Sequence, residues 1–162
     1  MSTLKEKLTE LLIKHEGLKL EVYKDTKGFD TIGVGRCLVT KGLSESECKY
    51  LKIDPVNYIE FLRVHGITKE QAEYLLSNDI DFFTNELIDS LDWFENLPET
   101  VKIVLLDMVF NLGLNGLLKF VHTLENIEHG RYIAASKEML NSKWKNDVGQ
   151  RAFDLSEMLA SC

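Results

Sequence analysis

The stretch KHEGLKLEVYKDTKGFDTIGVGR, from Lys14 to Arg36, changes its hydrophobic period partway along. Before it, Thr3 and Glu6 have the T-x-x-E spacing of a capping box, and leucines recur at the spacing of an amphipathic helix. After Gly17, a residue type that commonly ends helices, apolar and polar residues alternate, and DTKG has the residue order of a type I turn. The stretch therefore predicts a helix over 3–16, then a small antiparallel hairpin or three-stranded sheet over 18–39.

The remainder of the chain carries helical patterns and no further sheet signal. An S-x-x-E pair at 44–47 predicts a short helix, and residues 67–91 predict one long amphipathic helix that connects two lobes. The segment PETVKIVLLDMVFNLG, at 98–113, is too continuously apolar for a surface helix and predicts a central core helix that ends near Gly113. Further helices are expected at about 116–129, 131–143 and 149–160.

These patterns predict a mostly helical α+β fold. Its N-terminal lobe, over 1–66, contains the hairpin, and its helical C-terminal lobe spans 67–162. The chain has 162 residues, of which 44% are hydrophobic and 28% charged, so it is long enough to bury a core without the help of a cofactor.

Charge and cysteine content exclude several function classes. The formal net charge of −7 argues against nucleic acid or an anionic membrane as the main partner. Cys37, Cys48 and Cys162 are odd in number and form no CxxC pair, which favours reduced thiols over a disulfide framework or a zinc site. The histidines have no metal-ligand spacing, no signal peptide is recognisable, and we expect no segment long enough to cross a bilayer. We expect neither a metal nor a cofactor.

Glu16 stands where an apolar side chain is expected, because the stripe of Leu4, Leu8 and Leu12 continues to it in steps of four. A carboxyl on such a stripe is partly desolvated, which raises its pKa and suits a general acid. The alternative is a side chain that turns out to solvent at the helix end or pairs with an arginine.

Asp25, at the first position of the predicted turn, is a second carboxylate in a more solvated setting, although Asp there commonly only binds backbone N–H groups. Glycoside hydrolysis needs two carboxyl groups in different protonation states, one to protonate the leaving oxygen and one to activate water. Thr31 shares a strand face with Gly33 and Gly35. These glycines either let a substrate approach the backbone or only allow the strand to twist.

The segment HEGLKLEVYKDTKGFDTIGVG resembles the catalytic signature of the phage-type lysozymes, glycoside hydrolase family 24, and is most similar to the T-even phage lysozymes. ITKEQAEYLLSNDID, DMVFNLG and SKWKNDVGQRA resemble later segments of the same family, so the likeness covers nearly the whole chain. The resemblance implies a single lysozyme domain of two lobes with a groove between them. It also implies a muramidase that hydrolyses the β-1,4 bond between N-acetylmuramic acid and N-acetylglucosamine in peptidoglycan, with inversion at the anomeric carbon.

The resemblance assigns roles to particular residues. It makes Glu16 the general acid, Asp25 the carboxylate that positions or activates the attacking water, and Thr31 the hydroxyl that holds this water. It makes Arg151 the partner of the catalytic glutamate, which would lower the pKa of that carboxyl. It also places Phe110, Asn111 and Thr123 among substrate-binding residues, although core or capping roles fit these residue types equally well.

Arg36 departs from the family pattern, which usually has histidine there, whereas the partner aspartate is retained as Asp79. Because arginine stays charged where histidine titrates, we predict an ion pair between the lobes that is insensitive to pH between about 6 and 9. The alternative is an Arg36 side chain that extends into the substrate groove.

The resemblance also implies partners and location. We expect a monomer that binds peptidoglycan glycan strands, binds no nucleic acid and does not insert stably into membranes. It would stay in the host bacterial cytoplasm until lysis and, after release that depends on a holin, act on periplasmic peptidoglycan. The alternatives are a lysozyme within a phage tail particle and a non-catalytic carbohydrate-binding protein that keeps the fold.

Overall fold

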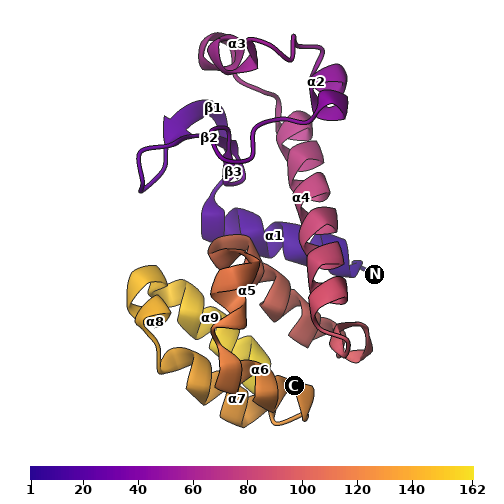
Figure 1. Ribbon diagram of the computed structural model, residues 1–162, viewed down its shortest axis with the longest axis vertical. Coiled ribbons are helices and arrows are strands. Elements are labelled where there is room, and N and C mark those ends of the chain that lie inside the picture. The colour runs from indigo at the N-terminus through magenta and orange to yellow at the C-terminus, as the bar shows by residue number, and fades with distance from the viewer. The chain divides into compact units, whose positions relative to one another are not determined.

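A computed structural model of the chain describes residues 1–162 (Figure 1). It consists of helices and one small sheet, which confirms the predicted mostly helical α+β fold. The elements in chain order are α1 (Leu4–Glu16), β1 (Lys19–Lys24), β2 (Asp30–Gly33), β3 (Arg36–Cys37), α2 (Glu45–Leu51), α3 (Tyr58–His65), α4 (Lys69–Ser90), the 3₁₀ helix η1 (Phe94–Asn96), α5 (Glu99–Leu118), α6 (Val121–Glu128), α7 (Tyr132–Leu140), α8 (Lys143–Val148) and α9 (Gln150–Ala160).

The chain divides into two compact units, each with its own internal contacts. One unit is Thr9–Asp79, and the other combines Met1–Leu8 with Ile80–Cys162. The division therefore falls inside α1 and α4 rather than in a loop. The lobes predicted from the sequence, 1–66 and 67–162, stay a prediction.

The unit of residues 9–79 contains the sheet, whose three antiparallel strands lie in the order β1-β2-β3, as Figure 1 shows. The sequence predicted this sheet and the turn between β1 and β2. In the turn, the Gly28 N–H donates to the Asp25 carbonyl at 3.0 Å. Tyr23 pairs with Thr31, and Thr31 pairs with Cys37, so three side chains form a row across one face of the sheet.

A hydrophobic core lies beneath the sheet of this unit. Its buried members are Ile32, Leu38, Leu51, Leu62, Ile67, Ala72 and Leu75. Gly33 faces this core, because a Cβ built on it would lie 3.7 Å from the side chains of Ala72 and Ile67. Because such a Cβ would make only ordinary contacts, the left-handed backbone of Gly33 (φ 67°), rather than close packing, favours glycine, and this side of the strand faces the core rather than a substrate.

Helix α3 was not predicted from the sequence. Its N-cap residue, Asn57, makes no side-chain capping hydrogen bond. Two of its apolar residues, Phe61 and Val64, are exposed, and only Leu62 is fully buried, so the eight-residue segment carries no capping signal and only a short apolar stripe. The helix is stabilised by tertiary contacts rather than by local signals, because α3 packs against β1 and Leu62 enters the core.

Helix α5 is the core helix of the other unit, as predicted. Its buried residues are Val101, Ile103, Val104, Leu105, Leu106, Asp107, Met108, Val109 and Leu117. The prediction that no segment is long enough to cross a bilayer was wrong, because Glu99–Leu118 reaches 20 residues with a mean hydropathy of 1.6. However, Gly113 has a non-helical backbone (φ 72°, ψ 167°) that kinks the helix at the predicted stop. Half of the apolar window is buried inside the protein, as in the core helix of a globular fold.

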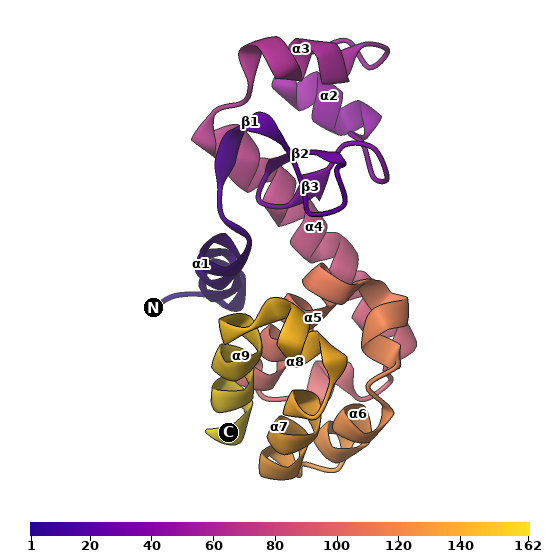
Figure 2. The same cartoon turned by 90° about the vertical axis from the view of Figure 1, so that its left-hand side faces the viewer.

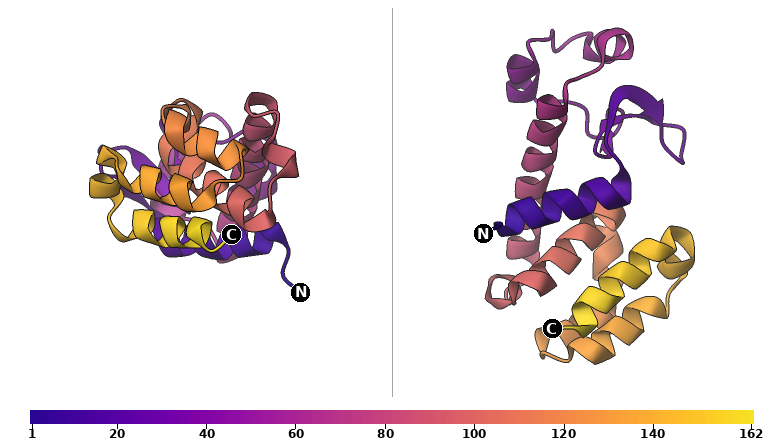
Figure 3. Two further views of the ribbon diagram at one scale, coloured as in Figure 1. Left: turned by 90° about the horizontal axis from the view of Figure 1, so that it is seen from below. Right: turned by 180° about the vertical axis from the view of Figure 1, so that it is seen from behind.

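Helices α6, α7, α8 and α9 complete this unit (Figure 2). Helix α7 packs on α6 and α9, and Figure 3 shows yellow α9 beside orange α7. The predicted helices at 131–143 and 149–160 correspond to α7 and α9, whereas the one at 116–129 begins later, at Val121. The six-residue helix α8 was missed, since a helix this short carries too few turns for a periodic pattern.

Candidate functional site

Glu16 is the last residue of α1, and its side chain is half-buried. Leu8 and Leu12, on the same stripe, are 1% and 0% exposed, so the helix buries the face that the sequence pattern predicted. Gly17 follows with φ of 80°, a left-handed conformation that ends the helix and turns the chain into β1. The carboxyl group is thus fixed at the junction between helix and sheet.

Asp25 is held at the other end of β1 by its own turn. Its Oδ1 accepts hydrogen bonds from the backbone N–H groups of Lys27 and Phe29, at 2.8 and 2.9 Å. Its backbone N–H donates to the Phe29 carbonyl at 2.9 Å. These are the turn contacts that the sequence offered as an alternative role. They use only Oδ1 and leave Oδ2 without a hydrogen bond to the protein.

Thr31 lies in β2 and is 2% exposed. Its Oγ1 donates a hydrogen bond to the Phe29 carbonyl at 3.0 Å. Because the hydroxyl proton is committed to this carbonyl, the lone pairs of Oγ1 remain as acceptors. Phe29 therefore orients both side chains, the Asp25 carboxylate through its N–H and the Thr31 hydroxyl through its carbonyl.

Tyr23 is a neighbour of this group that the sequence reasoning did not single out. It is the direct cross-strand partner of Thr31, and the Lys19 ammonium lies 4.2 Å from the centre of its ring. Burial, followed by the negative charges of Glu16 and Asp25, raises the pKa of the Tyr23 phenol above its usual value of 10. Counting outward from a four-residue DTKG turn would have paired Tyr23 with Asp30, whereas the observed register places Asp25 opposite Phe29 and hence Tyr23 opposite Thr31.

Arg36 is buried beside Asp79, as the sequence predicted. Its Nε donates to Oδ2 of Asp79 at 3.1 Å and its Nη2 to Oδ1 at 2.8 Å. Both residues belong to the compact unit of residues 9–79, so the pair lies within that unit, although it joins the two lobes as the sequence analysis bounded them. The Arg36 side chain is 1% exposed, so it does not extend into a groove.

Glu47 is the second partner of Arg36. Arg36 Nη1 donates to its Oε1 and Nη2 to its Oε2, each at 2.8 Å. Burial by itself would raise the pKa of Glu47, but hydrogen bonds from Arg36, the Ser44 N–H and Asn78 outweigh it and lower this pKa to about 2. The sequence showed Glu47 only as a capping-box residue, a role that it also has. Nothing in the sequence signalled its contact with Arg36.

The other predicted residues belong to the second unit. Arg151 Nε donates to Oδ1 of Asp107 at 2.8 Å, and both side chains are buried. Asn111 Oδ1 accepts from the indole N–H of Trp144 at 2.8 Å, and the Phe110 ring lies 5.6 Å from that of Phe83. Asp107 and Trp144 were not predicted as partners. The pairing of Arg151 with Glu16 stays a prediction.

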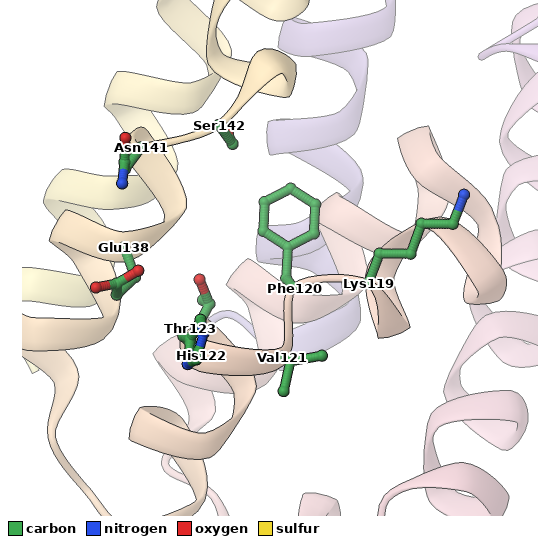
Figure 4. Close-up of a pocket in the computed structure, with 8 residues that line it drawn as sticks. All are labelled: Lys119, Phe120, Val121, His122, Thr123, Glu138, Asn141 and Ser142. Atoms are coloured by element: carbon green, nitrogen blue, oxygen red, sulfur yellow. The ribbon is translucent and has the colours of Figure 1, made fainter.

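Thr123, a predicted substrate-binding residue, lines an open pocket of about 190 Å³. The lining residues are Lys119, Phe120, Val121, His122, Thr123, Glu138, Asn141 and Ser142. Figure 4 shows that Thr123 and His122 lie across the opening from Glu138 and Asn141, with the Phe120 ring projecting toward the segment of Ser142. The lining thus combines one aromatic ring with hydroxyl, amide and charged groups.

The chain is similar in sequence to several known proteins. The family model of phage lysozyme matches residues 13–157, which include Glu16, Asp25, Thr31 and Arg151. Probable T4-type lysozyme 1 of Dictyostelium discoideum is 32% identical, over 90% of this chain and 88% of the relative, and probable T4-type lysozyme 2 is 30% identical with the same coverage. The pre-baseplate central spike protein Gp5 of Enterobacteria phage T4 is 26% identical, over 90% of this chain but only 26% of that protein. The chain therefore belongs to the phage lysozyme family and is a glycoside hydrolase of the lysozyme type.

Proposed function

We propose that this lysozyme is a muramidase that cleaves the β-1,4 bond between N-acetylmuramic acid and N-acetylglucosamine by an inverting mechanism. The observation that carries the proposal is the shared attachment of Asp25 and Thr31 to Phe29. This attachment leaves Oδ2 of Asp25, just after β1, and a lone pair of Thr31 Oγ1, in β2, as hydrogen-bond acceptors. Two such acceptors can hold a single water molecule by both of its protons.

In the proposed reaction, Glu16 donates its proton to the glycosidic oxygen as the C1–O bond breaks. A water that donates one hydrogen bond to Asp25 Oδ2 and one to Thr31 Oγ1 directs its lone pair at C1. As the new C–O bond forms, Asp25 takes the proton from this water. Each carboxyl thus acts once, and attack from the face opposite the leaving group inverts the anomeric carbon.

The second unit would supply the saccharide-binding residues. Thr123 and its pocket offer polar groups at fixed positions, and Phe110 and Asn111 would extend the binding surface along the glycan chain. Arg151, which donates to Asp107, would be the partner of the catalytic glutamate that the family resemblance implies.

The biological role that fits best is lysis of a bacterial host from within. Three free cysteines suit a protein that stays in the reducing cytoplasm until a holin opens the membrane. A monomer suits a small enzyme that must reach the periplasmic peptidoglycan. Expression in bacteria with and without a co-expressed holin tests this, with lysis expected only when the holin is present.

The deciding experiment is the clearing of outer-membrane-permeabilised Gram-negative cell walls by the purified protein. Glu16→Gln should abolish clearing, whereas Glu10→Gln, an exposed change on the same helix, should leave it intact. Circular dichroism checks that both variants fold. NMR of the first-formed anomer on soluble peptidoglycan fragments separates inversion from retention. Clearing that survives Glu16→Gln would reject the assigned mechanism.

A further inference from the structure

Tyr23 lies at the centre of the proposed catalytic group. It pairs directly with Thr31 across the sheet, and such partners have Cβ atoms about 4.5–5.5 Å apart. Asp25 follows it by two residues, and Glu16 lies at the end of the helix that leads into the same strand. Both carboxylates lie close enough for their charges to act on the phenol. Tyr23 therefore neighbours all three residues that the mechanism uses.

The Tyr23 hydroxyl has no hydrogen-bond partner within the protein, although its side chain is half-buried. No buried side-chain nitrogen or oxygen lacks a partner, so this hydroxyl keeps contact with solvent. The Lys19 ammonium lies over the face of the ring, 4.2 Å from its centre, and restricts the ring from that side. The result is a donor that is accessible, restrained and not used by the fold.

The charge state of Tyr23 suits a hydrogen-bond donor. Burial and the two neighbouring carboxylates all disfavour the phenolate and raise the pKa of Tyr23. The O–H is therefore retained at any pH at which Glu16 and Asp25 could act as an acid and base pair. A neutral donor adds no third negative charge beside them.

We propose that Tyr23 is a further substrate-contacting residue, whose hydroxyl donates a hydrogen bond to an oxygen of the N-acetylhexosamine unit whose C1–O bond is cleaved. This inference rests on the proposed function. The sugar must fit between the acid and the water-holding pair, and Tyr23 is adjacent to both. Its hydroxyl would thus anchor the reacting sugar where the bond breaks.

Tyr23→Phe tests the contact by removing one oxygen while keeping the ring and the contact with Lys19. We expect kcat/KM on soluble peptidoglycan fragments to fall about tenfold, as for the loss of one substrate hydrogen bond, with little change in Tm. Tyr50→Phe is the matched control, because Tyr50 lies in the same unit and stacks on Tyr74 at 3.7 Å. Equal activity of the two variants would overturn the inference.

A binding measurement separates this inference from the proposed function. In a Glu16→Gln background the fragments are not turned over, so calorimetry reports affinity alone. Weaker binding by about tenfold on adding Tyr23→Phe, with a saccharide-induced shift of the Tyr23 ring ¹³Cζ signal in the parent, supports the contact whether or not the parent cleaves walls. Unchanged affinity and no shift would reject the contact even if Glu16→Gln had confirmed the muramidase.

Discussion

Arg36 and Glu47 meet in a bidentate ion pair, with two parallel hydrogen bonds of 2.8 Å each. The same guanidinium also reaches Asp79 and the carbonyls of Gly42 and Leu75, so every N–H of the group has an acceptor. The planar fork of arginine makes this possible, whereas the histidine usual in the family has only two ring nitrogens. The cluster links β3 to α2 and α4 within the unit that contains the proposed catalytic residues.

Arg36→Met should destabilise the protein by about 3–5 kcal/mol, because it leaves two buried carboxylates without their main cation. Urea unfolding followed by circular dichroism measures the loss. Arg131→Met, a change at an exposed arginine of the same charge, should cost less than about 1 kcal/mol. Similar losses for the two variants would show that the buried cluster contributes no more than a surface arginine.

Glu47 should make the stability fall in acid. Its pKa is lowered from 4.5 to about 2 in the folded protein, so its contribution is present above about pH 4.5 and is lost as the pH falls toward 2. The full contribution corresponds to about 3 kcal/mol. In Glu47→Gln the free energy of unfolding should lose this part of its pH dependence, whereas Glu45→Gln, exposed on the same helix, should retain it. Parallel curves for parent and Glu47→Gln would contradict the assignment.

The Arg36–Asp79 pair should be insensitive to pH near neutrality. Burial by itself would lower the pKa of Arg36, but the hydrogen bonds and negative charges of Glu47 and Asp79 together outweigh it and raise this pKa, so the guanidinium stays charged across this range. Asp79→Asn should therefore cost the same at pH 5 as at pH 8, about 3 kcal/mol. Thermal unfolding at both pH values checks this. A clear difference between them would mean that another titrating group controls the contact.

Thr31→Val should lower kcat by about 10- to 100-fold with little change in KM, because the attacking water loses one of its two proposed acceptors. It should also cost about 1 kcal/mol of stability, since the Phe29 carbonyl loses its donor. Thr31→Ser keeps the hydroxyl and should retain most of the activity. If the Ser and Val variants were equally slow, the hydroxyl would have no role in catalysis.

Gly66→Ala should be more damaging than Gly130→Ala, although both glycines have positive φ, 64° and 74°. A Cβ at Gly66 would lie 2.4 Å from the Leu20 carbonyl oxygen, whereas one at Gly130 meets nothing within 4 Å. The Gly130 variant should cost about 1 kcal/mol for the left-handed backbone alone, and the Gly66 variant about 1–3 kcal/mol more for the collision. Equal losses in urea unfolding would show that the backbone at Gly66 relaxes freely.

The sequence predicted the elements whose signals are local. A capping box and a glycine stop delimit α1, a period of two and a turn motif define the hairpin, and a continuous apolar run marks α5 up to Gly113. It missed α3, which has no side-chain cap, and α8, whose six residues are too few for a periodic pattern. Packing against the rest of the protein decides both helices. It did not show that α5 continues beyond Gly113, its predicted end, to Leu118.

For the site, the sequence alone determined which carboxylates to consider, because the interval from Glu16 to Thr31 is a linear pattern that matches a family signature. Only the tertiary structure decided that Tyr23 stands beside Thr31, that Phe29 orients both Asp25 and Thr31, and that Arg36 is shared by Glu47 and Asp79. The physical reason is that cross-strand neighbours and buried ion pairs join residues far apart along the chain. A local pattern specifies residue types, and folding specifies which polar groups meet.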